Sequence, residues 1–242
     1  MVEVVPLGDL AIRVSFGDKI SEEIHKEIQV FTSKLAAAKL KGIIEWVPAY
    51  NTVAIYYRPE SISFTSLVEK VNEIYDQKNN VNPVQPIVYK IPVLYNGPDL
   101  SYIAACHNLM ENDVISLHSN KEYLIYMMGF VPGFPYLGGL SSKLAVPRLE
   151  HPRLSVAPGS VGIGGNQTGI YPSEVPSGWR ILGITPVKLF DVESSSPILF
   201  SAGNFIKFYP IDEQEYFRIK QLVEAKNYIV QTYKRGENNE GD

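Results

Sequence analysis

The chain has 242 residues, of which 45% are hydrophobic and 20% charged, so it can form one or two globular domains with an ordinary apolar core. Its net charge of −4 lacks the basic excess typical of nucleic-acid binding. No apolar run approaches the roughly 20 residues that span a bilayer, and residues 1–9 lack the features of a signal peptide, so the cytoplasm is the expected location. Cys106 is the single cysteine, which excludes an internal disulfide and a cysteine-based metal cluster.

The first third of the chain predicts a small α+β domain. Strand periodicity, with alternating or short apolar runs, is found at residues 10–16, 43–47, 52–57 and 87–93. One helix is expected after the capping residue Ser21 and a second from Phe64, because apolar residues recur there at helical spacing. The order strand, helix, strand, strand, helix, strand is the split βαβ arrangement of ferredoxin-like domains. Residues 1–84 are the expected extent of this domain.

The remainder of the chain predicts a second domain over residues 85–235. Two short helices are expected as a lead-in at 99–119. Residues 121–208 then contain short apolar runs separated by Gly/Pro turns, which indicate a β-barrel or a sandwich. A helix is expected at 214–226, and the polar tail at 236–242 is expected to be disordered.

The most unusual residues lie between Gly129 and Pro186. They include the run GFVPGFPYLGGL at 129–140 and the run QTGIYP at 167–172. With the Pro-Leu-Gly-Asp run at 6–9, these segments make the chain resemble the PxpB/KipI family, also called allophanate hydrolase subunit 1, over nearly its whole length.

This resemblance implies an N-terminal α+β domain followed by a cyclophilin-like β-barrel domain. It implies the B-type subunit of a 5-oxoprolinase that opens the lactam of 5-oxoproline to L-glutamate with ATP, and with Mg²⁺ held by the complex. A C-type (PxpC/KipA-like) subunit and an A-type (PxpA-like) protein are the implied partners. Two other roles stay open, namely inhibition of a sensor histidine kinase and a part in allophanate or urea metabolism. Leu149 and Ile184 stand at positions where arginines are usual in the family, so two guanidinium groups that would bind an anion are absent from this chain.

Two arginines and a glycine-rich segment are the candidate anion-binding groups. Arg148 and Arg153 offer the paired donors that bind a carboxylate or a phosphate, or they form structural salt bridges. The segment at 159–165, beginning with Gly159 and Ser160, presents backbone amides to an anion or forms barrel turns. It does not have the spacing of a Walker A loop.

Other polar and aromatic residues in the same region have two interpretations. Gln167, Thr168 and Tyr171 line the pocket as donors or satisfy backbone groups in a loop. Phe134, Tyr136 and Trp179 form a pocket wall or a partner surface, or they pack internally.

His118 is the candidate general acid or base, and the alternative is a core histidine with satisfied hydrogen bonds. No Ser-His-Asp order justifies a nucleophile, and no His-Glu-x-x-His motif or biotin signature occurs, so neither a metal site nor biotin is expected on this chain.

Overall fold

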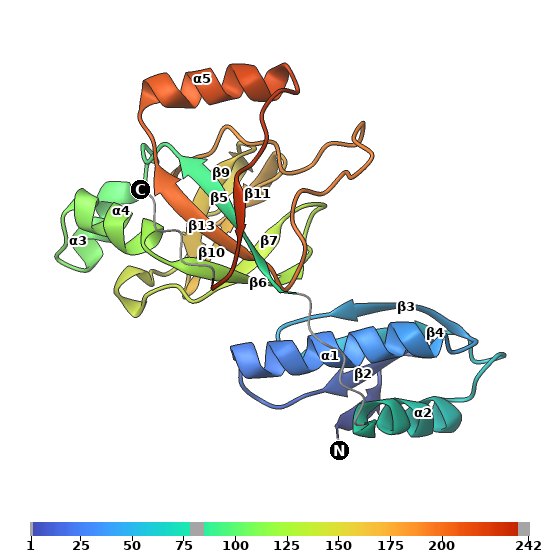
Figure 1. Ribbon diagram of the computed structural model, residues 1–242. Coiled ribbons are helices and arrows are strands. Elements are labelled where there is room, and N and C mark those ends of the chain that lie inside the picture. The colour runs from blue at the N-terminus through green and yellow to red at the C-terminus, as the bar shows by residue number, and fades with distance from the viewer. Residues whose placement is uncertain (1, 78–84, 237–242) are drawn as a thin grey trace. The chain divides into compact units, whose positions relative to one another are not determined.

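The computed structural model describes residues 2–77 and 85–236, which form two compact units, Met1–Val84 and Gln85–Asp242 (Figure 1). The expected disordered tail falls almost entirely outside the described residues. Within the described part of the chain, no helix is both long and apolar enough to cross a membrane.

The first unit is a four-stranded antiparallel sheet with two helices. Its strands are β1 (Glu3–Pro6), β2 (Ala11–Ser15), β3 (Ile43–Pro48) and β4 (Thr52–Tyr57), in the spatial order β1-β2-β4-β3. Helix α1 (Glu22–Ala38) follows β2, and helix α2 (Phe64–Asp76) follows β4. The predicted helices and the predicted hairpin are therefore confirmed.

One strand of the predicted order was assigned to the wrong sheet. Strand β5 (Ile87–Val93) pairs with strands of the second unit, and β1 takes the place beside β2 that the last strand of a split βαβ unit would take. The first unit thus has the ferredoxin-like strand arrangement with its edge strand supplied from the N-terminal side. The physical reason is that β5 is buried along almost its whole length, which suits a strand inside a larger sheet.

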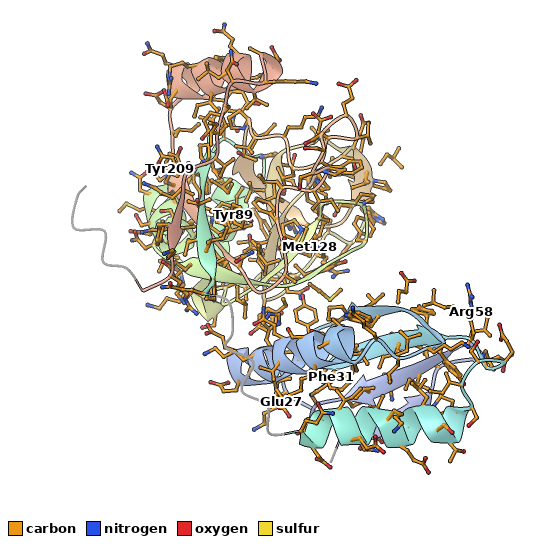
Figure 2. The ribbon with its side chains drawn as sticks, turned by 45° about the vertical axis from the view of Figure 1, so that its right-hand side comes forward. Glu27, Phe31, Arg58, Tyr89, Met128 and Tyr209 are labelled. Atoms are coloured by element: carbon orange, nitrogen blue, oxygen red, sulfur yellow. The ribbon has the colours of Figure 1, made fainter. Side chains whose placement is uncertain are left out.

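Both helices of the first unit pack into one core. The Ser21 hydroxyl accepts a hydrogen bond from the Ile24 N–H at 3.2 Å and caps α1, as its sequence predicted. Phe31 projects from α1 into this core (Figure 2), which it shares with buried residues of β2, β4 and α2. One turn before it, Glu27 accepts a hydrogen bond from the Tyr75 hydroxyl of α2. Apolar packing and this polar contact together hold the two helices side by side.

The second unit is built around an eight-stranded sheet. Its helices are α3 (Leu100–Cys106), α4 (Glu111–Ser119) and α5 (Glu213–Glu224), with a 3₁₀ turn at Ser142–Leu144. The large sheet has the order β12-β9-β10-β7-β6-β13-β5-β14, with β6 (Glu122–Met128), β7 (Pro135–Gly138), β9 (Ser160–Gly164), β10 (Gln167–Ile170), β12 (Arg180–Ile184), β13 (Phe205–Pro210) and β14 (Thr232–Lys234). Strands β8 (Arg153–Val156) and β11 (Val175–Ser177) form a separate two-stranded ribbon.

This sheet closes on itself as a barrel. Leu94, just beyond β5, exchanges two backbone hydrogen bonds of 2.9 Å with Ile184 at the end of β12, so the first and seventh strands of the sheet meet. Closure leaves only β14 as an appended edge strand on β5. Of the two predicted architectures, the barrel is confirmed.

Glycines on β9 and β10 make room for Trp179 on the barrel wall. A Cβ added at Gly164 would lie 2.3 Å from the indole Nε1 of Trp179, and one added at Gly169 would lie 3.2 Å from the same ring system. Trp179 is 6% exposed, so it has no free space into which to move. These glycines are therefore required by close packing.

We expect the Gly164→Ala substitution to lower the free energy of unfolding by about 1–3 kcal/mol, because the added methyl group overlaps the indole. Chemical denaturation followed by tryptophan fluorescence measures this. Gly129→Ala is the matched control, since its Cβ would meet only ordinary contacts at 3.8 Å. Equal stability of the two variants would contradict the packing role.

Candidate functional site

An aromatic cluster lies on the second unit, where β7, β10 and the start of β12 come together. It consists of Phe134, Val156, Tyr171, Trp179 and Ile181, with Tyr136 packed against it. Phe134 is central, with ring centroids 5.1 Å from Tyr136, 5.3 Å from Tyr171 and 5.7 Å from Trp179, all at edge-on angles. Phe134, Tyr171 and Trp179 are buried, so these three pack internally, and Tyr136 is half-buried.

Arg148 is the charged group at the surface of this cluster. Its guanidinium carbon lies 5.9 Å from the centre of the Trp179 ring, and the residue is exposed. No ion pair joins Arg148 to a carboxylate within residues 2–77 and 85–236. The guanidinium is therefore available to an anion from outside the chain.

The two phenols near Arg148 stay protonated at neutral pH. Burial raises the pKa of Tyr136 and of Tyr171, and the positive charge of Arg148 offsets only part of that rise. Protonated hydroxyls can donate hydrogen bonds, and so can the guanidinium. The Tyr171 hydroxyl is already hydrogen-bonded to the Ser177 hydroxyl, so Tyr136 and the Arg148 guanidinium are the groups here that suit a carboxylate or a phosphate.

Arg153 has a carboxylate partner inside the chain. Its Nη2 lies 2.8 Å from Oδ2 of Asp99, and its Nη1 donates to the Trp179 carbonyl oxygen at 3.2 Å. Asp99 also accepts from the Ile181 N–H at 2.7 Å and lies 3.4 Å from Nη1 of Arg180. Arg153 therefore forms a structural salt bridge, which was one of its two interpretations. The Arg153–Asp99 pair connects β8 to the segment that follows β5.

Asp99 and Arg180 were not singled out from the sequence. Asp99 was expected only as the cap of the helix that it precedes, where its side chain makes no capping hydrogen bond, and Arg180 directly follows Trp179. The Arg180 guanidinium also stacks on the Tyr102 ring of α3 at 3.7 Å. A carboxylate that is almost buried needs cationic partners. The sequence gives no sign that Asp99 is buried, because its place before a helix is also explained by capping.

The glycine-rich segment does not present its amides to an anion. The Gly159 N–H donates to the Tyr171 carbonyl at 2.7 Å, the Ser160 N–H donates to the Ala157 carbonyl, and Gly165 donates to Val146. The residues between them form β9, which pairs with β10 on one side and β12 on the other. Gly159 and Gly165 have φ values of +81° and +64°, so the alternative of barrel turns describes them.

His118 and Thr168 lie inside the barrel, away from solvent. The Tyr95 hydroxyl lies 2.7 Å from Nδ1 of His118, and Nε2 lies 2.9 Å from Oγ1 of Thr168. Because Thr168 donates its own hydroxyl proton to the Gly162 carbonyl at 3.0 Å, it must accept from Nε2, which makes Nδ1 the acceptor from Tyr95. Both ring nitrogens of His118 are thus satisfied.

The environment of His118 suits a structural histidine. The residue is fully buried, stacks on Phe208 at 4.6 Å, and burial lowers its pKa from 6.5 to about 3. A neutral ring with no exposed nitrogen cannot exchange protons with a bound substrate in this conformation. Gln167, at the start of β10, is half-buried beside Thr168 in the sequence.

His118 should make stability depend on pH. The ring stays neutral in the folded chain down to about pH 3, whereas an unfolded chain takes up a proton below about pH 6.5. Its contribution is therefore complete above pH 6.5 and is lost, at up to about 1.4 kcal/mol per pH unit, as the pH falls towards 3.

We expect the stability difference between the wild type and His118→Gln to shrink as the pH falls from 7 to 4. Urea unfolding at a series of pH values measures this difference. Burial also lowers the pKa of His25 to about 4, but His25 is present in both proteins, so its contribution cancels from the difference. A difference that stays constant with pH would contradict the assignment of a neutral buried ring.

A metal ion has no evident protein ligands here. Among the described residues, no group of three or more His, Cys, Asp or Glu side chains is arranged to hold one. The surface around Arg148 suits the anionic part of a nucleotide or a substrate, but it offers no carboxylate set for Mg²⁺.

The sequence of the chain as a whole matches a known class of domain. Residues 2–200 match the family described as carboxyltransferase domain, subdomain C and D. The chain is 37% identical over 232 residues to the B-type subunit of 5-oxoprolinase from Bacillus subtilis (strain 168), covering 90% of this chain and 97% of that protein. It is 36% identical over 211 residues to the Escherichia coli O157:H7 protein of the same name, with 86% and 95% covered. The chain therefore belongs to the PxpB family of 5-oxoprolinase subunits, as its motifs indicated.

Solved structures agree with the fold. The crystal structure of TTHA0988 is 32% identical with a TM-score of 0.74; the match covers 84% of this chain but only 39% of that longer chain. The Kluyveromyces lactis urea amidolyase gives a TM-score of 0.80 over 96% of this chain at 20% identity, and the match covers 16% of that protein, so it supports the fold alone.

Proposed function

We propose that this chain is the B-type (PxpB) component of an ATP-dependent 5-oxoprolinase, which opens the lactam of 5-oxoproline to L-glutamate. The observation that carries this proposal is its 37% identity to a protein named as that component, over 97% of that protein's length. The chain acts in the cytoplasm with a C-type subunit and an A-type protein, and the assembled complex holds ATP and Mg²⁺. Alone, the chain is inactive.

The chemistry explains what the chain must contribute. A lactam is a poor electrophile, and phosphorylation of its amide oxygen by ATP is one route to activate it. The complex must then bind a carboxylate and phosphates while charge develops on oxygen. Arg148 is the group of this chain that we assign to that anion, and Tyr136 donates a hydrogen bond beside it. The support is that Arg148 is exposed and lies on the face of Trp179.

Reconstitution tests the proposal. The purified chain, the C-type subunit and the A-type protein of the same genome are mixed with 5-oxoproline, ATP and Mg²⁺, and glutamate is measured. Glutamate should form only when every component is present. If the complete set left 5-oxoproline intact and hydrolysed a urea-derived amide, the assignment would pass to urea metabolism. Inhibition of a sensor histidine kinase by the chain alone, without glutamate formation by the set, would favour the regulatory role.

A further inference from the structure

The segment that carries Arg148 has no regular secondary structure of its own. Its backbone is held where the Leu149 N–H donates to the Gly178 carbonyl oxygen at 2.7 Å. A Cβ added at Gly178 would lie 3.7 Å from the Cβ of Arg148, so the two backbones are in close contact. The next residue, Trp179, presents its ring to the Arg148 guanidinium at 5.9 Å. The position of Arg148 therefore depends on the position of residues 177–179.

One guanidinium group, that of Arg153, holds residues 177–179 at both ends. Arg153 pairs with Ser177 across the β8–β11 ribbon, and its Nη1 donates to the Trp179 carbonyl oxygen at 3.2 Å. Its other terminal nitrogen, Nη2, lies 2.8 Å from Oδ2 of Asp99. The planar group thus joins the Trp179 backbone to a carboxylate on a distant segment of the chain.

Asp99 is a fixed anchor for this guanidinium. The residue is 4% exposed, its N–H donates to the Ile181 carbonyl oxygen at 3.1 Å, and its Oδ2 accepts from the Ile181 N–H at 2.7 Å. Oδ1 faces Nη1 of Arg180 at 3.4 Å. Moving the carboxylate would leave a buried charge and a buried N–H without partners, which is costly. Asp99 therefore keeps Arg153 in one orientation.

The two arginines have a common neighbour in Tyr171. Burial raises the pKa of this phenol, and the positive charges of both Arg148 and Arg153 offset part of the rise, so both guanidinium groups lie near it. The Tyr171 hydroxyl is hydrogen-bonded to Ser177, whose Oγ also accepts from the Trp179 N–H at 3.1 Å. Arg153 is thus close enough to affect the anion site, although its own charge is paired within the chain.

We infer that Arg153, oriented by Asp99, is a positioning residue for the Arg148 anion site. This inference rests on the proposed function. Arg153 keeps residues 177–179 in place, so that the Gly178 carbonyl and the Trp179 ring hold Arg148 where the anion binds. Arg153 does not bind the anion itself, because both of its terminal nitrogens already have acceptors.

The Arg153→Lys variant of the reconstituted complex tests the inference. Lysine keeps a positive charge beside Asp99, so the buried carboxylate stays paired, but a single ammonium cannot replace the planar guanidinium that also reaches the Trp179 carbonyl. We expect kcat/KM for 5-oxoproline to fall about tenfold, since a small displacement of a binding group lowers the rate strongly. Initial rates of glutamate formation measure it.

The double variant separates positioning from a direct or a general structural role. If Arg153 acts through Arg148, Arg153→Lys should have no further effect once Arg148 is replaced by alanine. Arg148→Ala with Arg153→Lys should then show the loss of about 100-fold expected for Arg148→Ala alone, and not the product of about 1,000-fold. Asp99→Asn should give the same pattern as Arg153→Lys, because an amide oxygen can still accept from the Ile181 N–H but lacks the charge that orients Arg153.

Arg235→Lys is the matched control. The Arg235 side chain is 33% exposed and lies 3.3 Å from Glu122, much as the Arg153 side chain is 30% exposed and pairs with Asp99. This control should leave kcat/KM unchanged. Thermal unfolding of each isolated chain shows that the variants compared are folded.

Three results would overturn the inference while the proposed function stands. They are multiplied losses in the double variant, an unchanged rate in both Arg153→Lys and Asp99→Asn, and an equal loss in Arg235→Lys. The first would mean that Arg153 contributes independently of Arg148, and the third that any ion pair of this unit matters equally. If the complete wild-type set formed no glutamate, the proposed function would fail and this inference with it.

Discussion

The Arg148→Ala variant is expected to lower kcat/KM for glutamate formation by the reconstituted complex about 100-fold or more. Removing a guanidinium that binds a charged oxygen in a partly desolvated site costs about 3 kcal/mol or more of transition-state stabilisation. Arg148→Lys should recover only part of the loss, since an ammonium keeps the charge but not the planar pair of donors. Initial rates at varied 5-oxoproline concentration measure both variants.

The isolated Arg148→Ala chain should remain as stable as the wild type, within about 0.5 kcal/mol, because the side chain is exposed. Arg218→Ala is the matched control, an exposed arginine on α5 whose guanidinium is paired with Glu215 at 2.7 Å. It should leave the rate unchanged. Wild-type activity in Arg148→Ala would contradict the assigned anion site.

The second large effect is expected at His118, on stability. His118→Ala should lower the free energy of unfolding by about 3–5 kcal/mol. The substitution leaves a cavity beside Phe208, and it leaves the buried Tyr95 and Thr168 hydroxyls each without one hydrogen-bond partner. Guanidinium denaturation of the full chain measures the change.

His151→Ala is the control for this experiment, since His151 is exposed, and it should change stability by less than about 0.5 kcal/mol. The milder His118→Gln variant separates the structural role from a catalytic one. If it folds and assembles with its partners, its turnover per complex should match the wild type. A folded His118→Gln complex with no turnover would restore the general acid or base role.

Local patterns in the sequence predicted the helices well, because the evidence for a helix lies within a few turns. The Ser21 cap and the apolar face of α1 are examples, and both are present in the structure. Strand pairing depends on distant residues, so β5 was predicted as a strand but placed in the wrong sheet. Strand β1 was missed because its four residues do not alternate clearly between apolar and polar.

The candidate site shows the same division. Arg148 could be chosen from the sequence as a candidate anion-binding residue, because that choice needs only the chemistry of the guanidinium group. The contrast between Arg148 and Arg153 could not be predicted, since it depends on Asp99 reaching across from another segment. Phe134 and Trp179, noted for their chemistry, proved to be packed inside.

The N-terminal origin of β1 has a consequence for protein synthesis. Because every strand and helix of the first unit is complete by Asp76, this unit can fold as soon as it leaves the ribosome. The barrel has no such advantage, since β5 is made early and its parallel neighbour β13 emerges only after most of the second unit. At about 5–20 residues per second, β5 waits on the order of ten seconds with an open edge. We therefore expect the second unit, and not the first, to need a chaperone during translation.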